Sequence, residues 1–237
     1  MANLQRQEEI LEYLKKRRFA SIAELAERLY TSQATVRRDV EKLAAAGALK
    51  SVYGGVVLAE YENTPMPIFL RDKENSASKE RIAERAAALI RDNSTVIFDS
   101  SSTVRRMCKH IVTKKGLTVV TNNLRVCQEL KDSDVKVVCT GGTLLHGREC
   151  FVGHFAENFV RQIKADMLFF SSQGLSENGD ITDSSEEEVA LRRAMMGSAT
   201  EHYFLCDSSK LGRDYPFVLC NSADVSATVF DDEVKKT

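Results

Sequence analysis

The chain has 237 residues, of which 28% are charged and 43% are hydrophobic, an ordinary composition for a globular protein. Its 33 Lys and Arg residues nearly balance its 34 Asp and Glu residues, which excludes a uniformly basic, histone-like protein and a polyacidic tail. Residues 1–58 hold ten Lys or Arg against seven Asp or Glu, whereas the rest hold 23 against 27. This asymmetry favours a small nucleic-acid-binding domain joined to a domain of another kind.

The sequence contains no run of 18 apolar residues, and its first residues lack the apolar core of a signal peptide. We therefore expect a cytoplasmic protein with no membrane partner. The cysteines lie at positions 108, 127, 139, 150, 206 and 220, and none has Cys-x-x-Cys spacing. They are expected to be reduced and mostly buried thiols. The four histidines also lack ligand spacing, so we expect no metal and no cofactor.

The first two predicted helices follow from apolar spacing and a cap. Leu4, Ile10, Leu11 and Leu14 fit one stripe of a helix. After Phe19 and Ala20, Ser21 and Glu24 have the spacing of a capping box, in which each side chain satisfies a free amide at the helix start. The helix that they open is expected to bury Ile22, Leu25, Ala26 and Leu29.

A third helix and a β-ribbon are predicted next. Ser32 is the expected N-cap of the helix, and Gly47 is expected to end it. The inward positions of this helix are Val36, Val40 and Leu43. Residues 49–58 alternate weakly around a Tyr-Gly-Gly turn, which indicates a short ribbon. Three helices followed by a ribbon predict a winged helix-turn-helix.

The outward face of the third helix is polar and basic. Arg37 and Arg38 are adjacent, so one can reach a base edge while the other reaches a phosphate. The planar fork of arginine suits both, and hydroxyls near a helix N-terminus bind phosphate as well. The expected DNA-binding residues are Ser32, Gln33, Thr35, Arg37 and Arg38 of the helix and Lys50 and Tyr53 of the ribbon. The alternative is a solvated charged helix in a small domain that binds another protein.

Residues 31–43 read Thr-Ser-Gln-Ala-Thr-Val-Arg-Arg-Asp-Val-Glu-Lys-Leu, and Gly47-Ala48-Leu49 and Tyr53-Gly54-Gly55 follow them. This run resembles the helix-turn-helix signature of the DeoR family of bacterial regulators of sugar metabolism. The Thr-x-Arg-Arg-Asp core and the Gly-Gly pair are both present, and Tyr53 stands where the family usually has His. The resemblance continues through the rest of the chain and covers nearly all of it.

Residues 59–75 lose periodicity and are interpreted as a linker between a first domain, 1–58, and a second domain, 76–237. In the second domain, strands are expected at 95–99, 117–120, 135–139, 166–171, 202–207 and 225–230. Helices are expected at 79–90, 103–111, 124–130, 155–163 and 186–196. Short apolar strands that alternate with helices predict an α/β domain with a mostly parallel sheet covered on both faces.

Ligands of such sheets bind beyond the carboxyl ends of the strands, and five of these ends are small and polar here. The expected effector-binding residues are Asp99, Ser100, Ser101, Ser102 and Thr103 after the first strand, Thr121, Asn122 and Asn123 after the second, Gly141 and Gly142 after the third, Gly174 after the fourth, and Lys210 after the fifth. Hydroxyls and loop amides cradle an anion, and a lysine supplies charge for phosphate. The pattern favours a pocket for a phosphorylated polyol; the alternative is that each loop only caps the next helix.

The resemblance implies the same pocket, because the second domain looks like the effector-sensing domain of the DeoR family, similar in fold to ribose-5-phosphate isomerase and the coenzyme A transferases. Arg71 and Lys79 match the pattern that couples the two domains in that family. Glu188 and Arg192 match a further family helix, in which Arg192 either faces the pocket or is a solvated helix charge.

These features predict a transcriptional repressor of a sugar or polyol utilisation operon, whose binding to double-stranded operator DNA is controlled by a phosphorylated sugar. DNA-binding heads of this kind act as symmetric pairs, so a homodimer or tetramer is expected. Two alternatives are a sugar-phosphate isomerase with Asp99 as its base, and a protein-binding adaptor with a vestigial enzyme domain. The sequence shows no Ser-His-Asp, Cys-His or metal constellation, so we expect no catalytic residues and no enzyme.

Overall fold

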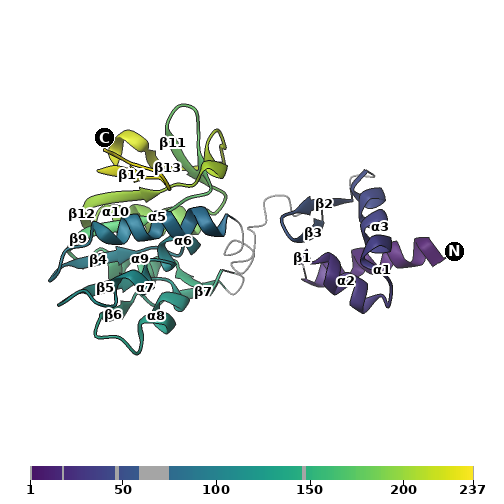
Figure 1. Ribbon diagram of the computed structural model, residues 1–237, viewed down its shortest axis with the longest axis horizontal. Helices are drawn as coiled ribbons and strands as arrows, with labels where there is room; N and C mark the ends of the chain where they lie inside the picture. Colours follow the sequence, from purple (N-terminus) through teal and green to yellow (C-terminus); the bar gives the residue numbers. More distant parts are fainter. Residues whose placement is uncertain (1, 18, 46–47, 59–74, 146–147, 237) are drawn as a thin grey trace. The chain divides into compact units, whose positions relative to one another are not determined.

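The protein is described by a computed structural model covering residues 2–17, 19–45, 48–58, 75–145 and 148–236 (Figure 1). The described residues form two compact units, a head before residues 59–74 and a body after them. The predicted linker therefore lies outside the described residues, as does Arg71. The exact domain boundaries stay a prediction.

The head contains three helices and a small antiparallel sheet of strand order β1-β3-β2, which confirms the winged helix-turn-helix. Its elements are α1 (Ala2–Arg17), β1 (Phe19–Ala20), α2 (Ile22–Arg28), α3 (Gln33–Ala45), β2 (Leu49–Val52) and β3 (Gly55–Leu58). Both predicted caps are present. Glu24 N donates to Ser21 Oγ over 3.0 Å at the start of α2, and Thr35 N donates to Ser32 Oγ over 3.2 Å at the start of α3. Gly47 and the side chain of Leu4 lie outside the described residues.

The helices of the head pack around one apolar core. Its buried members include Ile10 and Leu14 of α1, Leu25 of α2, Val36, Val40 and Leu43 of α3, and Val56 and Leu58 of β3. Beside this core, the buried carboxylate of Asp39 accepts a 2.5 Å hydrogen bond from Arg6 Nε, which joins α3 to α1. The apolar stripes predicted from the sequence therefore face inward, and the exposed face of α3 is the polar one.

The body is built on a seven-stranded sheet of order β15-β14-β12-β9-β4-β5-β6, parallel except for β15. The strands are β4 (Thr95–Phe98), β5 (Thr118–Thr121), β6 (Lys136–Cys139), β9 (Ala165–Phe170), β12 (Ala199–Leu205), β14 (Ala227–Val229) and β15 (Val234–Lys236). The helices are α5 (Ser76–Ala88), α6 (Ser102–Arg105), α7 (Cys108–Ile111), α8 (Leu124–Leu130), α9 (His154–Val160) and α10 (Glu186–Met196). The predicted mostly parallel sheet is confirmed.

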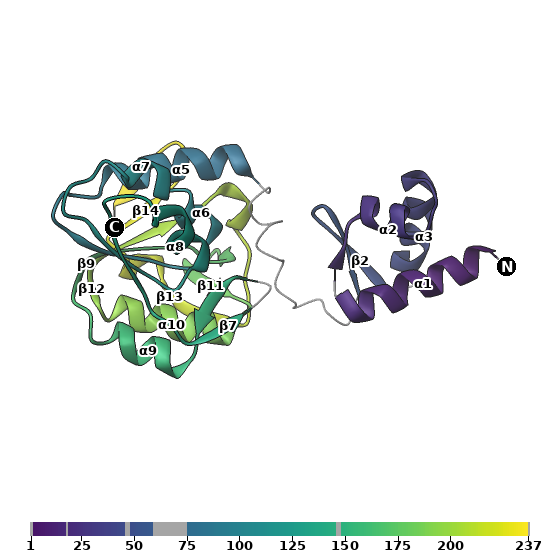
Figure 2. The ribbon, with the colours of Figure 1, turned by 90° about the horizontal axis from the view of Figure 1, so that it is seen from below.

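Helices cover both faces of this sheet, with α5 and α7 on one side and α9 and α10 on the other (Figure 2). Successive strand residues point to opposite faces, so the sheet supplies two cores. Phe98 and Phe169 belong to the core under α5, whereas Ile97 and Phe170 belong to the core under α9 and α10. This two-sided burial explains why the strands read as continuous apolar runs in the sequence.

Several elements differ from the sequence-based expectation. The single helix expected at 103–111 is two short helices, α6 and α7. Seven short strands were not predicted. β1 joins the sheet of the head, and β15 joins the edge of the seven-stranded sheet. β7 (Thr143–Leu145) pairs with β8 (Cys150–Val152), and β10 (Gly174–Leu175), β11 (Asp180–Asp183) and β13 (Phe217–Asn221) form a separate sheet. All six cysteines are free; three are buried, two are partly buried and Cys139 is exposed. In the described ranges, no helix combines the length and apolarity needed to cross a bilayer.

Candidate functional site

The exposed face of α3 borders a groove in the head. The groove has a volume of about 460 Å³ and lies between the start of α2, one face of α3 and the β2–β3 hairpin. Gln33, Arg37 and Glu41 line it at intervals of four residues, so they share one face of the helix. Arg38 is also exposed, on the adjacent part of the helix surface.

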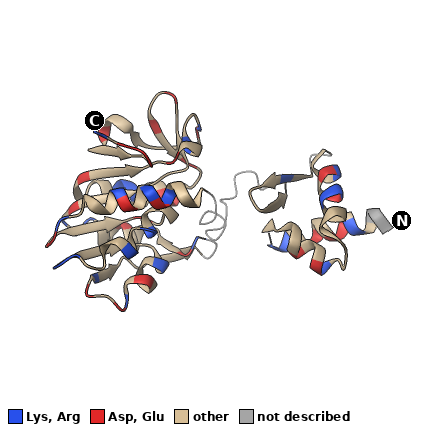
Figure 3. Cartoon of the chain, in the orientation of Figure 1, with Lys and Arg blue, Asp and Glu red and all other residues tan. Residues whose placement is uncertain are grey.

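The other predicted DNA-binding residues lie around this face. Ser32 Oγ and Thr35 Oγ1 are 2.9 Å apart in an exposed hydrogen bond at the N-terminus of α3. Lys50 is exposed on β2, and Tyr53 is exposed in the turn that joins β2 to β3. Figure 3 shows basic residues on both α3 and β2. Gln33 and Arg37 of α3 share the groove with Ser51, Val52 and Gly54 of the hairpin, whereas Lys50 and Tyr53 are exposed outside its lining.

In the body, hydrogen bonds join the loops at the carboxyl edge of the sheet. Thr121 Oγ1, at the end of β5, donates to the carbonyl of Phe98 at the end of β4 over 2.8 Å. Thr140 N, after β6, donates to the carbonyl of Thr121 over 2.9 Å. Ser171 N, after β9, donates to Asp99 Oδ2 over 3.2 Å, and Lys210 Nζ, after β12, donates to Ser171 Oγ. All five predicted loops therefore meet at one edge.

The first of these loops is held by Asp99. Asp99 Oδ1 accepts from Ser101 N over 2.9 Å, and its Oδ2 accepts from Ser171 N and from Arg192 Nε. Ser101 Oγ caps α6 by accepting from Val104 N. Ser100, Ser102 and Thr103 are also buried. These residues shape the edge of the sheet through contacts within the protein.

The second loop carries two buried polar atoms without a partner among the described residues. Asn122 Nδ2 donates to the carbonyl of Phe151 over 2.9 Å, but Asn122 Oδ1 has no partner. Asn123 Oδ1 accepts from Arg125 N over 3.0 Å at the start of α8, but Asn123 Nδ2 has none. An unsatisfied buried polar atom costs about 1–3 kcal/mol, so a native protein keeps one for a reason. One acceptor and one donor on adjacent residues suit a ligand that offers hydroxyls.

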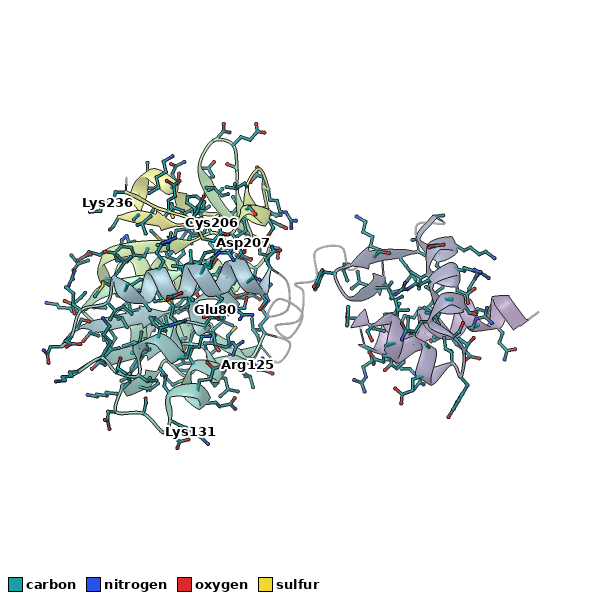
Figure 4. All side chains as sticks on the ribbon, viewed as in Figure 1. Glu80, Arg125, Lys131, Cys206, Asp207 and Lys236 are labelled. Carbon is teal, nitrogen blue, oxygen red and sulfur yellow. The ribbon has the colours of Figure 1, made fainter. Side chains whose placement is uncertain are left out.

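The loop after β12 supplies charge. Lys210 has its side chain mostly buried and 3.9 Å from Asp207. Asp207 Oδ1 also accepts from Asn75 Nδ2 over 3.1 Å. Burial of Asp207 opposes its ionisation, but the charge of Lys210 and hydrogen bonds from Ser209 outweigh burial and lower its pKa. Figure 4 shows Cys206 and Asp207 where β12 ends. Lys79 is buried on α5 and its charge also reaches Asp207.

The glycines of the predicted site have different roles. Gly141 and Gly142 have φ of 63° and 112°, and a Cβ on Gly142 would lie 2.7 Å from the carbonyl of Val152. Gly142 requires glycine for both backbone conformation and close approach, whereas at Gly141 only the left-handed backbone favours it. Gly174 lies in β10, outside the parallel sheet, where a Cβ would lie 2.4 Å from the carbonyl of Arg213. Packing of β10 against the segment at Arg213 accounts for that glycine.

A buried ionic network behind the first loop was missed by the sequence analysis. Arg192 donates to Asp99, to Asp183 over 2.9 Å and to Glu188 over 3.3 Å. Burial lowers the pKa of Arg192, but the nearby carboxylates outweigh that effect and raise it. Arg192 is only 2% exposed, so its interpretation as a solvated helix charge is wrong.

Glu188 links this network to two loops. Its Oε1 accepts a 2.6 Å hydrogen bond from Ser100 Oγ, and its Oε2 forms an ion pair with Arg148, next to β8. The signal in the sequence was the i, i+4 spacing of Glu188 and Arg192, which places both on one face of α10. Nothing in the local sequence indicated that this face is buried against the edge of the sheet.

A second depression lies beside the edge, with a volume of about 530 Å³ between α6, α8 and the β7–β8 hairpin. Its two arginines, Arg105 and Arg125, form ion pairs with Glu129 and Glu149. These carboxylates offset the positive charge of the arginines.

Models of known families match almost the whole chain. The model of the DeoR-like helix-turn-helix domain matches residues 6–62, and the model of the DeoR C-terminal sensor domain matches residues 74–232. The chain belongs to the DeoR family. It is therefore an HTH-type transcriptional regulator, and the resemblance noted from residues 31–55 is confirmed.

Individual relatives of this DeoR-family chain agree. The HTH-type transcriptional regulator GolR of Listeria innocua is 30% identical over 100% of this chain and 93% of that protein. The L-fucose operon activator of Haemophilus influenzae is 31% identical over 96% of this chain and 91% of that protein. The lactose phosphotransferase system repressor of Staphylococcus aureus is 29% identical over 97% of this chain and 92% of that protein. Activators and repressors thus both occur among the named relatives.

Solved structures share the fold of part of the chain. A tetrameric eIF2B-beta2-delta2 complex from C. thermophilum matches 69% of this chain and 58% of that chain, with 12% identity and a TM-score of 0.51. Ribose-5-phosphate isomerase A from Methanocaldococcus jannaschii matches 58% of this chain and 55% of the isomerase, with 13% identity and a TM-score of 0.44. The alignments span little more than half of either solved chain.

Proposed function

We propose that this DeoR-family regulator represses a sugar or polyol utilisation operon, and that a phosphorylated sugar bound in the body controls its binding to operator DNA. The observation that carries the effector proposal is the pair of buried, unpartnered atoms on Asn122 and Asn123 at an edge where five loops meet. The observation that carries the DNA proposal is the exposed pair Arg37 and Arg38 on α3.

In the head, we propose that Arg37 reads bases and Arg38 binds phosphate, with Ser32, Gln33 and Thr35 contacting DNA at the start of α3. The exposure of Arg37 and Arg38 supports this assignment. We propose that Lys50 and Tyr53 of the hairpin contact the DNA backbone. Symmetric heads on palindromic half-sites would need a homodimer or tetramer, which we also propose.

In the body, Lys210 supplies the charge for phosphate, and Asn122 and Asn123 supply an acceptor and a donor for sugar hydroxyls. The remaining proposed effector-binding residues come from the loops that meet at this edge or directly follow them: Asp99, Ser100, Ser101, Ser102, Thr103, Thr121, Gly141, Gly142 and Gly174. The ligand controls DNA binding only if it has different affinities for the DNA-competent and DNA-incompetent arrangements of the chain.

A catalytic function is a weaker candidate. The isomerase alternative needs Asp99 as a base, but both of its carboxylate oxygens already accept hydrogen bonds from backbone amides or Arg192. Those contacts favour a structural role for Asp99 over proton transfer. The named relatives are regulators, and we propose that this chain is not an enzyme.

The effector proposal is tested by a thermal-shift screen of the full chain against sugar phosphates, because a ligand that binds only the folded state raises the melting temperature. We expect at least one to raise Tm and to change the affinity for DNA. In Lys210→Ala this response should be lost while DNA binding without ligand stays intact. Lys131→Ala is the matched control, because Lys131 is exposed at the end of α8. Turnover of a sugar phosphate by the wild-type chain would contradict the proposal.

The dependence of DNA affinity on salt concentration tests the proposal that the head binds DNA. Phosphate contacts impose a steep fall in affinity with salt concentration, whereas a protein-binding adaptor shows no salt-sensitive DNA affinity. Arg37→Ala should weaken binding to the operator by about 1–3 kcal/mol if this residue reads a base. Unchanged binding in that variant would show that another face of the head meets DNA.

A further inference from the structure

The turn between α2 and α3 carries the most exposed large apolar side chain in the described part of the chain. Tyr30 is 97% exposed, compared with 76% for Phe155 in the body. An aromatic ring in this position buries almost no surface within the head, so it adds almost nothing to the stability of the fold. The side chain of Tyr30 is therefore accessible to a partner of the head.

The backbone conformation at Tyr30 lowers the stability of the head relative to a chain with glycine there. Thr31 N donates to the carbonyl of Ala26 over 3.0 Å, and Tyr30 N donates to the carbonyl of Glu27 over 3.2 Å. This is the Schellman pattern that ends a helix, and it requires a left-handed backbone at Tyr30, whose φ is 48°. Glycine and asparagine adopt that conformation readily, whereas tyrosine does so at a cost. The head would therefore be more stable with a glycine or an asparagine at this position.

The position of Tyr30 indicates what its side chain contacts. It lies three residues before the start of α3 and two before Ser32, whose exposed hydroxyl bonds that of Thr35 at the N-terminus of the helix. The N-terminal residues of a recognition helix enter the major groove, so residues just before it meet the phosphates that border the groove. A tyrosine hydroxyl donates to phosphate oxygens, and its ring is rigid enough to order at little entropic cost.

We propose that Tyr30 binds the phosphodiester backbone of DNA, with its hydroxyl donating to a phosphate oxygen at the N-terminal end of α3. The proposal rests on the DNA-binding function of the head proposed above and adds a contact outside the groove between α3 and the β2–β3 hairpin. It explains why the turn holds a residue that its backbone conformation disfavours.

The test uses the full chain and a random-sequence 40-base-pair duplex, because a backbone contact does not depend on sequence. Tyr30→Gly, Tyr30→Asn and Tyr30→Phe are each expected to weaken binding about 10- to 100-fold, the effect of one hydrogen bond to a charged group. The salt dependence should keep its slope, because tyrosine is uncharged, whereas Arg38→Gln should lower that slope by about one. Amide exchange over α2 and α3 should slow in the glycine and asparagine variants, because both relieve the backbone.

Three results would overturn this contact. Wild-type affinity in Tyr30→Phe would show that the hydroxyl binds no phosphate. Weakened binding in Tyr30→Gly but not in Tyr30→Asn would assign the effect to a looser turn. A smaller mass of the Tyr30 variants by light scattering would assign the ring to a contact between copies of the chain. If the wild-type chain shows no salt-dependent binding to DNA, the proposed DNA-binding function fails instead.

Discussion

Replacing Arg192 by methionine tests whether the buried network of the body holds the effector loops in place. The guanidinium donates to three carboxylates, those of Asp99, Asp183 and Glu188, and all four side chains are almost completely buried. Methionine fills a similar volume but offers no donor, so three carboxylates lose a shared cation in the interior.

Arg192→Met is expected to lower the free energy of unfolding of the body by a large amount. Breaking a buried ion pair by removing one partner destabilises a protein by about 3–5 kcal/mol, because an uncompensated charge is left in the interior. Since a domain is stable by only about 5–15 kcal/mol, Arg192→Met should remove about a fifth of the stability of the body or more. The folded variant then binds protons more readily than the unfolded chain, so lowering the pH from 7 towards 5 should recover part of the loss.

The assay is urea unfolding of the full chain followed by circular dichroism, with hydrogen exchange over β4 and α10 to assign the change to the body. Arg193→Met is the matched control, because Arg193 lies on the same helix but donates only to the carbonyls of Val218 and Leu219 and is largely exposed. Equal stability of Arg192→Met and the wild type, or an equal loss in the two variants, would refute the role given to the network.

Three further predictions concern the rest of the chain. A hydrogen bond from Cys127, together with one from the backbone of Gly141, outweighs burial and lowers the pKa of Cys139 to about 6. The rate of alkylation by iodoacetamide, followed by mass spectrometry, should therefore rise near pH 6 at Cys139 and only above pH 8 at the other thiols. A rise at Cys139 only above pH 8 would contradict this prediction. Gly55→Ala should destabilise the head by about 1–3 kcal/mol, because a Cβ would lie 2.2 Å from the carbonyl of Ala20, whereas Gly197→Ala meets only ordinary contacts and should be neutral in the same unfolding assay. Asp39→Ala should cost about 1–3 kcal/mol by removing the acceptor of Arg6, and unchanged exchange over α1 would argue against that link.

Local signals in the sequence were sufficient for most of the helices and for six of the seven strands of the main sheet. The capping box of Ser21 and Glu24 starts α2, because each side chain accepts a hydrogen bond from the backbone amide of the other residue. These contacts are local and need no tertiary fold. The alternation of Phe169 and Phe170 between two cores follows from strand geometry alone. The edge at which polar loops gather was predictable for the same reason, because parallel strands end on one side.

The atoms that are available to a ligand could not be predicted in this way. Asp99 and Arg192 are 93 residues apart, and only the folded body shows that they bind each other. The pairing of Asn122 with Phe151 depends on the β7–β8 hairpin, whose strands are too short for the sequence pattern to reveal. The backbone strain at Tyr30 is likewise visible only in its φ.

The fixation of the loop after β4 has a thermodynamic consequence for sensing. Asp99 and Glu188 hold Ser101 and Ser100 through hydrogen bonds within the protein, so a bound ligand has little left to order at that end. A small entropic cost of ordering the site favours high affinity for the ligand. The signal must then come from groups whose hydrogen bonds change when the ligand binds. In the described loops, Asn122 Oδ1 and Asn123 Nδ2 are such groups, because they have no hydrogen-bond partner within the protein.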